Sequence, residues 1–242
     1  MQNRDHARGQ ATHWAAFTAC SAIWTPPGCM TRWKVFTSRP NIWPIMTRFC
    51  KTPKPRWTMP MCSTACALWK RGAWASVLED AVAAGQLALR AIHGDPKVDN
   101  IMLDNTTKQA VSIVDLDTVK PGLVHYDIGD GLRSCCNRLG EETDQIDAVT
   151  FDTELCKVIL DGYLSQARHF FSQADYDYIY ACIRLITFEL GLRFFSDHLA
   201  GNVYFKVKDE RHNLRRALVQ FKLCESIEAQ EAEIQSIVRA VY

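Results

Sequence analysis

The sequence predicts an α+β fold that is mainly helical, with one small β-hairpin and an irregular or disordered N-terminal third. Three observations lead to this prediction. Apolar residues recur at helical spacing through most of the chain after residue 150. Two short apolar runs flank a polar turn near residue 105, which favours a hairpin. Residues 1–78 show no sustained period of 2 or 3.6 and are interrupted by prolines.

The composition changes near residue 78, which divides the chain into two expected parts, residues 1–78 and 79–242. The first part holds eleven Lys or Arg and one acid, a net charge of +10, whereas the second carries −9. The first part also contains all seven Trp but only two Leu. Three interpretations stay open for it: a basic, aromatic arm that binds nucleic acid, an irregular folded lobe, and sequence not selected to fold. Because no recognised binding motif organises its residues, we do not expect nucleic acid as a partner.

The whole chain has a globular composition, with 48% hydrophobic and 23% charged residues in 242 positions. This excludes a collagen-like or fully disordered protein. No apolar run reaches the roughly 18 residues that a membrane span needs, and the start lacks the pattern of a secretion signal. We therefore expect no membrane partner. The ten Cys include no CxxC pair, so we expect reduced, mostly buried thiols and a cytoplasmic location.

The first predicted elements after the composition change are short. A helix ends over residues 77–84, and Gly85 is its natural C-terminal stop. Residues 87–92 are expected to be extended. Residues 100–103 and 110–114 are apolar runs around a polar turn and predict a hairpin.

The Lys-Pro-Gly sequence at 120–122 favours a turn, and most of the chain beyond it is predicted to be helical. Apolar residues over 151–167 repeat on one face of a helix. Ser172 is expected to cap a long helix that continues to about His198. Asn213 is expected to cap the last helix.

Residues with the chemistry of an active site gather between positions 93 and 130. They form HGDPKVDN at 93–100, VDLD at 114–117, HYD at 125–127, and Asp130. Single acids and Asn often serve only as turn residues. The ordered set is better explained by phosphoryl transfer, which needs a carboxylate to accept the proton of an attacking hydroxyl and oxygen ligands for magnesium. We expect these side chains at strand ends and in loops rather than on helix faces.

The pattern of His93, Asp95 and Asn100, followed by Asp115 and Asp117, resembles the aminoglycoside phosphotransferase and choline kinase superfamily, which has a protein-kinase-like fold. The strings HGDPKVDNIMLD and SIVDLDTVKPGLVHYDIGD are similar to the N-acetylhexosamine 1-kinase branch, which moves the ATP γ-phosphoryl group to the anomeric hydroxyl of a sugar. The resemblance covers about residues 79–235. It implies a kinase-like C-terminal lobe with the hairpin at its catalytic loop, ATP and Mg²⁺ as cofactors, and a sugar or amino-sugar substrate.

The resemblance also implies roles for individual residues. Asp95 would be the general base, and Asn100 and Asp115 would bind magnesium. Asp117 would either bind the metal as well or brace Asp115, and both interpretations stay open. His93 would be a structural residue of the loop.

Asp127 would hold the catalytic loop from below, and Lys97 would contact a phosphate of the nucleotide, although a solvated loop lysine is the commoner case. Arg193 and Tyr204 are similar in placement to residues that touch the sugar in the sugar-kinase branch. The alternative is that Arg193 pairs with Glu189 on the helix surface, four residues away, and that Tyr204 only packs.

One expected part of such a kinase is not recognisable in the sequence. Residues 1–78 contain no G-x-G-type loop, no strand of the V-x-I-K type and no Glu to pair with its lysine. We therefore predict weak or absent kinase turnover for this polypeptide. Two other functions stay open: a non-catalytic module that binds a sugar or nucleotide, and a metal-dependent phosphoester hydrolase.

Overall fold

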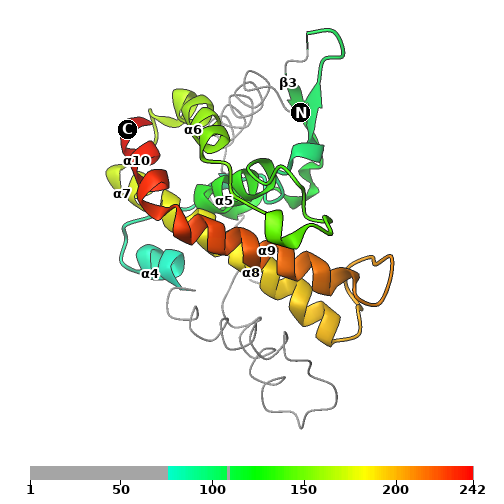
Figure 1. Cartoon of the computed structure of the whole chain (residues 1–242). Helices are drawn as coiled ribbons and strands as arrows, with labels where there is room; N and C mark the ends of the chain where they lie inside the picture. The colour runs from blue at the N-terminus through cyan, green and yellow to red at the C-terminus, as the bar shows by residue number, and fades with distance from the viewer. Residues whose placement is uncertain (1–75, 108–109, 242) are drawn as a thin grey trace.

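The computed structural model of the chain describes residues 76–107 and 110–241. Over these residues the fold is mainly α-helical, with two small antiparallel sheets of two strands each (Figure 1). This confirms the predicted α+β class. The predictions made for residues 1–75 lie outside the described residues.

The first sheet joins two segments that are far apart in the sequence. Helix α4 (Val77–Ala83) is followed by Gly85, whose φ of 71° lies in the left-handed region, as predicted for a C-terminal stop. Strand β1 (Arg90–Ile92) pairs antiparallel with β4 (Lys120–Gly122), so the prediction of a turn at 120–122 is wrong. Pro121 is tolerated here because each strand of a two-stranded sheet has an edge at which an N–H group is not needed.

Strands β2 (Ile101–Leu103) and β3 (Ala110–Ile113) form the second sheet, an antiparallel hairpin that confirms the prediction. In the turn after β2, Asp104 Oδ1 accepts hydrogen bonds from the backbone N–H groups of Thr106 (2.9 Å) and Thr107 (2.6 Å). Such bonds are typical of Asp in turns. The 3₁₀ turn η2 (Val98–Asn100) ends where β2 begins, so the hairpin directly follows the loop at residues 93–97.

The remaining elements are helices. They are η3 (Leu116–Thr118), α5 (Val124–Cys135), η4 (Ile146–Ala148), α6 (Thr153–Ala167), α7 (Gln173–Asp177), α8 (Ile179–Leu199), α9 (His212–Ala229) and α10 (Glu231–Val241). Helix α6 confirms the helix predicted over 151–167. Its N-terminus is capped by Asp152, which accepts a hydrogen bond from the N–H group of Leu155 at 2.8 Å.

Two predicted helix boundaries need correction. Ser172 caps a helix as predicted, in a capping box with Asp175, but that helix ends at Asp177, and α8 begins after a break at Tyr178. Asn213 is not a cap, because α9 begins one residue earlier and the buried Asn213 amide donates to Asp197 Oδ2 at 2.9 Å. A tertiary hydrogen bond therefore outweighs the capping preference of Asn at this position.

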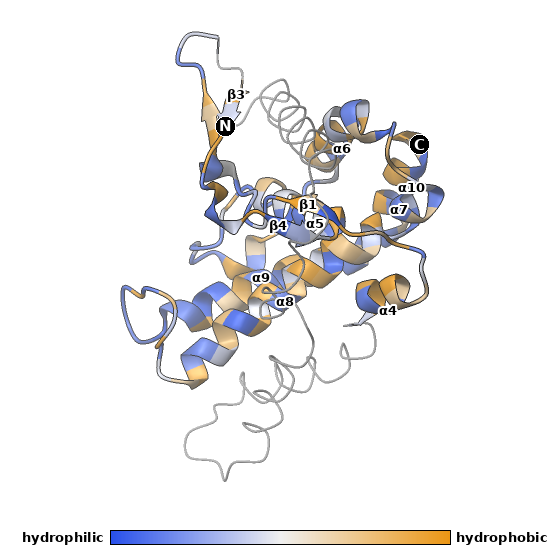
Figure 2. Cartoon of the chain, turned by 180° about the vertical axis from the view of Figure 1, so that it is seen from behind, coloured by the Kyte–Doolittle hydropathy of each residue, from blue (hydrophilic) through white to orange (hydrophobic). Residues whose placement is uncertain are grey.

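Helix α8 is the central element of the fold. Helix α9 runs alongside it, α5 packs against it, and α10 contacts both α6 and α8 (Figure 1). Figure 2 shows hydrophobic and hydrophilic stretches alternating along α9, as expected for a helix with one buried side. Helix α5 approaches α8 closely at Gly129, where a Cβ atom would lie 2.8 Å from the carbonyl oxygen of Cys182. This contact fixes the part of α5 that carries Asp127 and Asp130.

Two further features of the described residues are the hydropathy of their helices and the state of their cysteines. None of their helices combines the length and hydropathy that crossing a bilayer requires. Their five cysteines are free thiols, and four of them are buried, as expected for small apolar side chains.

Candidate active site

The loop after β1 is held by a buried carboxylate on α5. Asp127 is fully buried, and its oxygens accept hydrogen bonds from the backbone N–H groups of His93 (2.7 Å) and Gly94 (2.9 Å). Burial raises the pKa of Asp127 to about 6, although both hydrogen bonds favour its charged form. The two bonds tie the loop to α5, which is the arrangement that a supporting role for Asp127 requires.

His93 joins the same loop to the segment after β3. Its side chain is buried, with Nε2 2.8 Å from the carbonyl oxygen of Val114 and Nδ1 3.3 Å from the backbone nitrogen of Asp95. These contacts assign the ring proton to Nε2, because the carbonyl oxygen can only accept and the N–H group of Asp95 can only donate. In this tautomer, His93 links the backbone of Asp95 to the residue that precedes Asp115.

Gly94 allows two loops to touch. Its φ is 86°, and a Cβ atom at this position would lie 2.8 Å from the carbonyl oxygen of Thr118. The Thr118 hydroxyl donates to the carbonyl oxygen of His93 at 2.7 Å. Glycine is required here both for its backbone conformation and for the close approach.

Asp95 presents a partly exposed carboxylate at the edge of this loop. Its Oδ2 accepts hydrogen bonds from Lys97 Nζ at 2.6 Å and from Asn100 Nδ2 at 3.3 Å, and the same Asn100 nitrogen donates to the Asp95 carbonyl oxygen at 2.7 Å. Burial lowers the pKa of Lys97, but its hydrogen bond and charge interaction with Asp95 outweigh this, so the net pKa is raised. A substrate hydroxyl that uses Asp95 as a base must therefore compete with Lys97 for the carboxylate.

Asp115 lies beside the Asn100 segment. The N–H group of Val114 donates to the carbonyl oxygen of Asn100 at 2.9 Å. This bond places the backbone of Asp115, the next residue, close in space to Asn100. The φ of Asp115 is 67°, a left-handed conformation that Asp adopts more readily than most residues. A hydrogen bond with Asp117 and the negative charge of Asp117 raise the pKa of Asp115, as expected for neighbouring carboxylates.

These oxygen atoms fit magnesium as a partial set of ligands. Within residues 76–107 and 110–241, no group of three or more His, Cys, Asp or Glu side chains is arranged to hold a metal ion by itself. Magnesium is commonly bound by one or two carboxylates, with water and substrate phosphates completing its octahedron. The paired carboxylates of Asp115 and Asp117, and the amide oxygen of Asn100, suit that chemistry.

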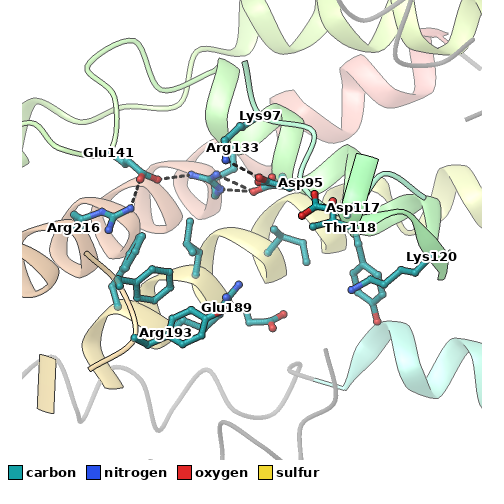
Figure 3. Close-up of a pocket in the computed structure, with 18 of the residues that line it drawn as sticks. Asp95, Lys97, Asp117, Thr118, Lys120, Arg133, Glu141, Glu189, Arg193 and Arg216 are labelled. Carbon is teal, nitrogen blue, oxygen red and sulfur yellow. Dashed lines mark hydrogen bonds and ion pairs between the residues drawn. The ribbon is translucent and has the colours of Figure 1, made fainter. Parts of the chain in front are cut away.

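A cavity of about 560 Å³ opens beside the loop (Figure 3). Asp95, Lys97 and Asp117 line part of it, and Arg193 and Tyr204 line it as well. The structure thus brings the predicted base and the predicted sugar-binding residues, which are distant in the sequence, to one cavity.

Side chains from α8, the loop after it and α9 form one wall of the cavity. This aromatic–arginine wall consists of Arg193, Phe194, Tyr204, Phe205 and Arg216. The ring centroids of Phe194 and Tyr204 each lie 4.8 Å from that of Phe205. The Cζ atoms of Arg193 and Arg216 lie 5.5 and 5.6 Å from the Phe205 centroid, within cation–π range. The wall therefore combines flat apolar surfaces with fixed hydrogen-bond donors.

A chain of ion pairs connects α5 to this wall (Figure 3). Arg133 contacts Asp130 at 2.8 Å and Glu141 at 3.5 Å, and Glu141 also pairs with Arg216. The side chains of Arg133 and Arg216 are only 7% and 13% exposed. Glu141 therefore balances the charge of two largely buried guanidinium groups.

Glu141→Gln is expected to lower the free energy of unfolding by about 1–3 kcal/mol, because it leaves Arg216 buried without its carboxylate partner. Urea denaturation of the full chain measures this change. Glu225→Gln is the matched control, since Glu225 is exposed and pairs with the exposed side chain of Lys222 three residues away, and its loss should stay below about 1 kcal/mol. Equal losses in the two variants would contradict the assignment of Glu141.

Glu189, one helical turn before Arg193, also lines the cavity. Burial raises the pKa of Glu189 to about 7, while the charge of Arg193 opposes this shift and that of Glu79 adds to it. The alternative expectation places Glu189 and Arg193 as a pair on the outer surface of the helix. Both residues instead line the cavity. The two side chains influence each other, but they do so at a cavity.

Glu189→Gln is expected to change how stability depends on pH. The pKa of Glu189 is higher in the folded chain than its ordinary 4.5, so the wild type loses stability as pH rises from about 4.5 to about 7. The variant lacks this loss, so its Tm relative to the wild type should increase over that range, by the equivalent of at most about 3 kcal/mol. Thermal unfolding of both proteins at several pH values measures it, and parallel curves would contradict the prediction.

The other predicted site residues lie around the cavity rather than on it. Asn100, Asp115, His93 and Asp127 are not among the described lining residues. The expectation that the acids lie in loops and not on helices is wrong for Asp127 and for Asp130, which both belong to α5. Asp95 and Asp115 lie in loops as expected, whereas Asp99 and Asn100 belong to the 3₁₀ turn η2 and Asp117 to η3, on either side of the hairpin.

Sequence reasoning missed Glu141, Phe205 and Arg216 as residues of the site. Their partners lie on other elements of the fold, among them α5, α8 and α9. No local spacing in the sequence therefore predicts that these residues belong to the site. Arg216 lies 75 positions from Glu141, for example. A weak signal was available in the Arg-Phe-Phe and Tyr-Phe sequences at 193–195 and 204–205, which place aromatic residues beside a cation.

Part of the chain matches a known protein family. Residues 37–154 match the model of the phosphotransferase enzyme family. The match includes all the predicted catalytic and metal-binding positions from His93 to Asp127, and it supports a relationship to the aminoglycoside phosphotransferase and kinase-like superfamily. It begins before residue 78, where the composition changes, and it ends before α8, the loop after it and α9, which together supply the aromatic–arginine wall.

Proposed function

We propose that the chain is an ATP-dependent phosphotransferase that phosphorylates a hydroxyl group of a small sugar, such as the anomeric hydroxyl of an N-acetylhexosamine. The observation that carries the proposal is the placement of Asp95. Its carboxylate borders the same cavity as Arg193 and Tyr204, and the oxygens of Asn100, Asp115 and Asp117 lie on the adjoining segments. The family match supports the phosphotransferase class.

Asp95 would accept the proton of the acceptor hydroxyl. As that O–H bond breaks, the hydroxyl oxygen forms a bond to the γ-phosphorus, and the bond from this phosphorus to the β–γ bridging oxygen breaks to release ADP. Lys97 holds the Asp95 carboxylate in place before the acceptor enters, at 2.6 Å. Once the acceptor displaces Lys97 from Asp95, the ammonium group would be free to contact a phosphate of the nucleotide, which is the role predicted for it.

Asn100 and Asp115, with Asp117, are the residues that would hold magnesium. When bound, the ion would neutralise charge on the nucleotide phosphates. Within this arrangement, Asn100 has a second task, because its amide nitrogen bonds to both the backbone and the side chain of Asp95. His93 and Asp127 hold the backbone of the loop from the other side.

The aromatic–arginine wall would receive the acceptor. The apolar C–H face of a pyranose ring packs on aromatic side chains, as apolar surfaces do generally, and Tyr204 presents a side chain that is 63% exposed. Arg193 provides donors for the hydroxyl or carbonyl oxygens of the sugar. The wall thus favours a ring-shaped acceptor with both an apolar face and polar substituents.

The test is to incubate the full chain with Mg²⁺, ATP and N-acetylhexosamines and to measure sugar 1-phosphate by ³¹P NMR and ligand binding by calorimetry. ATP-dependent formation of sugar 1-phosphate supports the proposal, even at a turnover far below the roughly 1–100 s⁻¹ usual for kinases. Slow turnover is expected because no nucleotide-covering lobe is recognisable in residues 1–78. Sugar binding without transfer would instead indicate a binding module, and phosphoester hydrolysis without ATP would indicate a hydrolase.

A further inference from the structure

The loop between α8 and α9 is organised around one buried carboxylate. Asp197, in the last turn of α8, is only 6% exposed. Its Oδ1 accepts hydrogen bonds from the N–H groups of Val203 (3.0 Å) and Tyr204 (2.9 Å), and its Oδ2 accepts one from the N–H group of Phe205 (3.0 Å). Three consecutive backbone donors thus converge on one side chain.

A fourth donor connects this carboxylate to α9. The amide nitrogen of Asn213 donates to Asp197 Oδ2 at 2.9 Å and to Asn202 Oδ1 at 3.1 Å. Asn202 has a φ of 59°, and its own N–H group donates to the carbonyl oxygen of Asp197 at 2.8 Å. We call the carboxylate of Asp197 and its four donors the Asp197 clasp.

The position of Asp197 does not favour α8 itself. A negative charge in the last turn of a helix is unfavourable, because the carbonyl end of the helix is the negative end of its dipole. Burying a carboxylate also costs free energy unless its oxygens are hydrogen-bonded. The bonds to the loop offset both costs, so the benefit of this residue lies in the loop conformation.

The loop conformation determines the cavity wall. The backbone groups that the clasp holds belong to Tyr204 and Phe205, which both line the cavity. The Phe205 ring contacts two guanidinium groups, with the Cζ atoms of Arg193 and Arg216 at 5.5 and 5.6 Å from its centroid. A small change in the backbone at Phe205 would therefore disturb both cation–aromatic contacts.

We infer that Asp197 is a positioning residue for the acceptor, which holds Tyr204 and Phe205 so that the wall binds the ring of a neutral sugar. This inference rests on the proposed function and assigns the specificity of the site to a residue that does not touch the substrate. It separates acceptor binding from nucleotide binding, because the clasp lies in the α8–α9 loop and the predicted metal ligands lie after β1 and β3 (Figure 1).

The experiment compares the full-length wild type with Asp197→Asn by calorimetric titration with N-acetylglucosamine, N-acetylgalactosamine and ATP in the presence of magnesium. The Kd for the sugar that the wild type binds should rise by about tenfold or more, which corresponds to a loss of about 1.4 kcal/mol. The Kd for ATP should stay within about twofold of the wild-type value. Hydrogen exchange at the amides of Val203, Tyr204 and Phe205 should become faster.

Asp209→Asn is the matched control. Asp209 is an exposed acid of the same loop that accepts a hydrogen bond from the N–H group of Arg211 (2.9 Å) and pairs with Arg215, and it does not line the cavity. Its sugar Kd and the exchange of the three amides should match the wild type. If Asp197→Asn does not fold, Asp197→Glu keeps the charge but displaces the carboxylate, and it should show the same selective loss of sugar affinity.

The outcomes separate the two ideas. Sugar binding by the wild type with an unchanged Kd in the Asp197 variants would overturn the role of Asp197 and leave the proposed function standing. Equal losses of sugar and ATP affinity would also overturn it, because they would show a general structural effect. A wild type that neither binds nor phosphorylates any sugar would overturn the proposed function, and the inference with it.

Discussion

Asp95→Asn is expected to lower the rate of phosphoryl transfer by about 10²–10⁴-fold, the usual contribution of a general base. The amide preserves the size of the side chain but cannot accept the hydroxyl proton. The carboxylate charge that holds Lys97 at 2.6 Å is lost as well. Transfer of radiolabelled phosphate from ATP to the sugar, measured in single-turnover mode, detects the change even when the wild type is slow.

Asp99→Asn is the control for this substitution. Asp99 belongs to the same loop sequence and is exposed, and it does not line the cavity. Its rate should stay close to that of the wild type. If Asp95→Asn retains the wild-type rate, or if both variants lose it equally, Asp95 is not the base. The affinity for ATP should be similar in all three proteins, since Asp95 acts on the acceptor.

The parts of the site that follow from the sequence are those made by local contacts. Asn100 reaches Asp95 across five residues, and His93 reaches it across two. The Asp104 turn closes the hairpin between neighbouring runs, and Ser172 bonds with Asp175 three residues later. In each case the two partners are at most five residues apart, so their residue types and spacing are enough to indicate the contact from a single sequence.

The corrected elements are those in which a distant partner decides the structure. Pro121 belongs to a strand because it pairs with Ala91, thirty residues earlier. Asn213 is drawn into α9 by Asp197 and does not cap the helix. Local preference at these positions is worth about 1 kcal/mol or less, and a buried hydrogen bond can outweigh it.

The acceptor side of the cavity depends on contacts between segments that are distant in the sequence, above all on helix packing. Glu189 lines the cavity from α8 and Arg216 from α9, and Glu141 precedes both helices and pairs with Arg216. The effect of these charges on stability and binding is decided only when the helices pack side by side. Burial then sets the desolvation cost of each charged group, and pairing sets the favourable interaction that offsets it. The sequence therefore predicts the reaction class better than it predicts the residues that select the acceptor.

Asp115→Ala is expected to abolish magnesium-dependent turnover, because it removes the carboxylate best placed to act as the main metal ligand. The substitution also puts Ala into a backbone with φ of 67°, a conformation that Ala tolerates poorly. Asp115→Asn therefore accompanies it, since Asn adopts the left-handed conformation readily and differs mainly in charge. Turnover of each variant is measured across a magnesium titration.

Loss of turnover in both variants, with unchanged thermal unfolding for Asp115→Asn, assigns the effect to the carboxylate and not to the backbone.

Asp117→Ala distinguishes the two interpretations of the neighbouring acid. If Asp117 binds the metal, the magnesium concentration needed for half-maximal rate should rise. If it only braces Asp115, with which it shares a hydrogen bond, the rate should fall at saturating magnesium. Asp147→Ala, an exposed acid in η4, should behave like the wild type. Undiminished turnover in both Asp115 variants would remove this residue from the metal site.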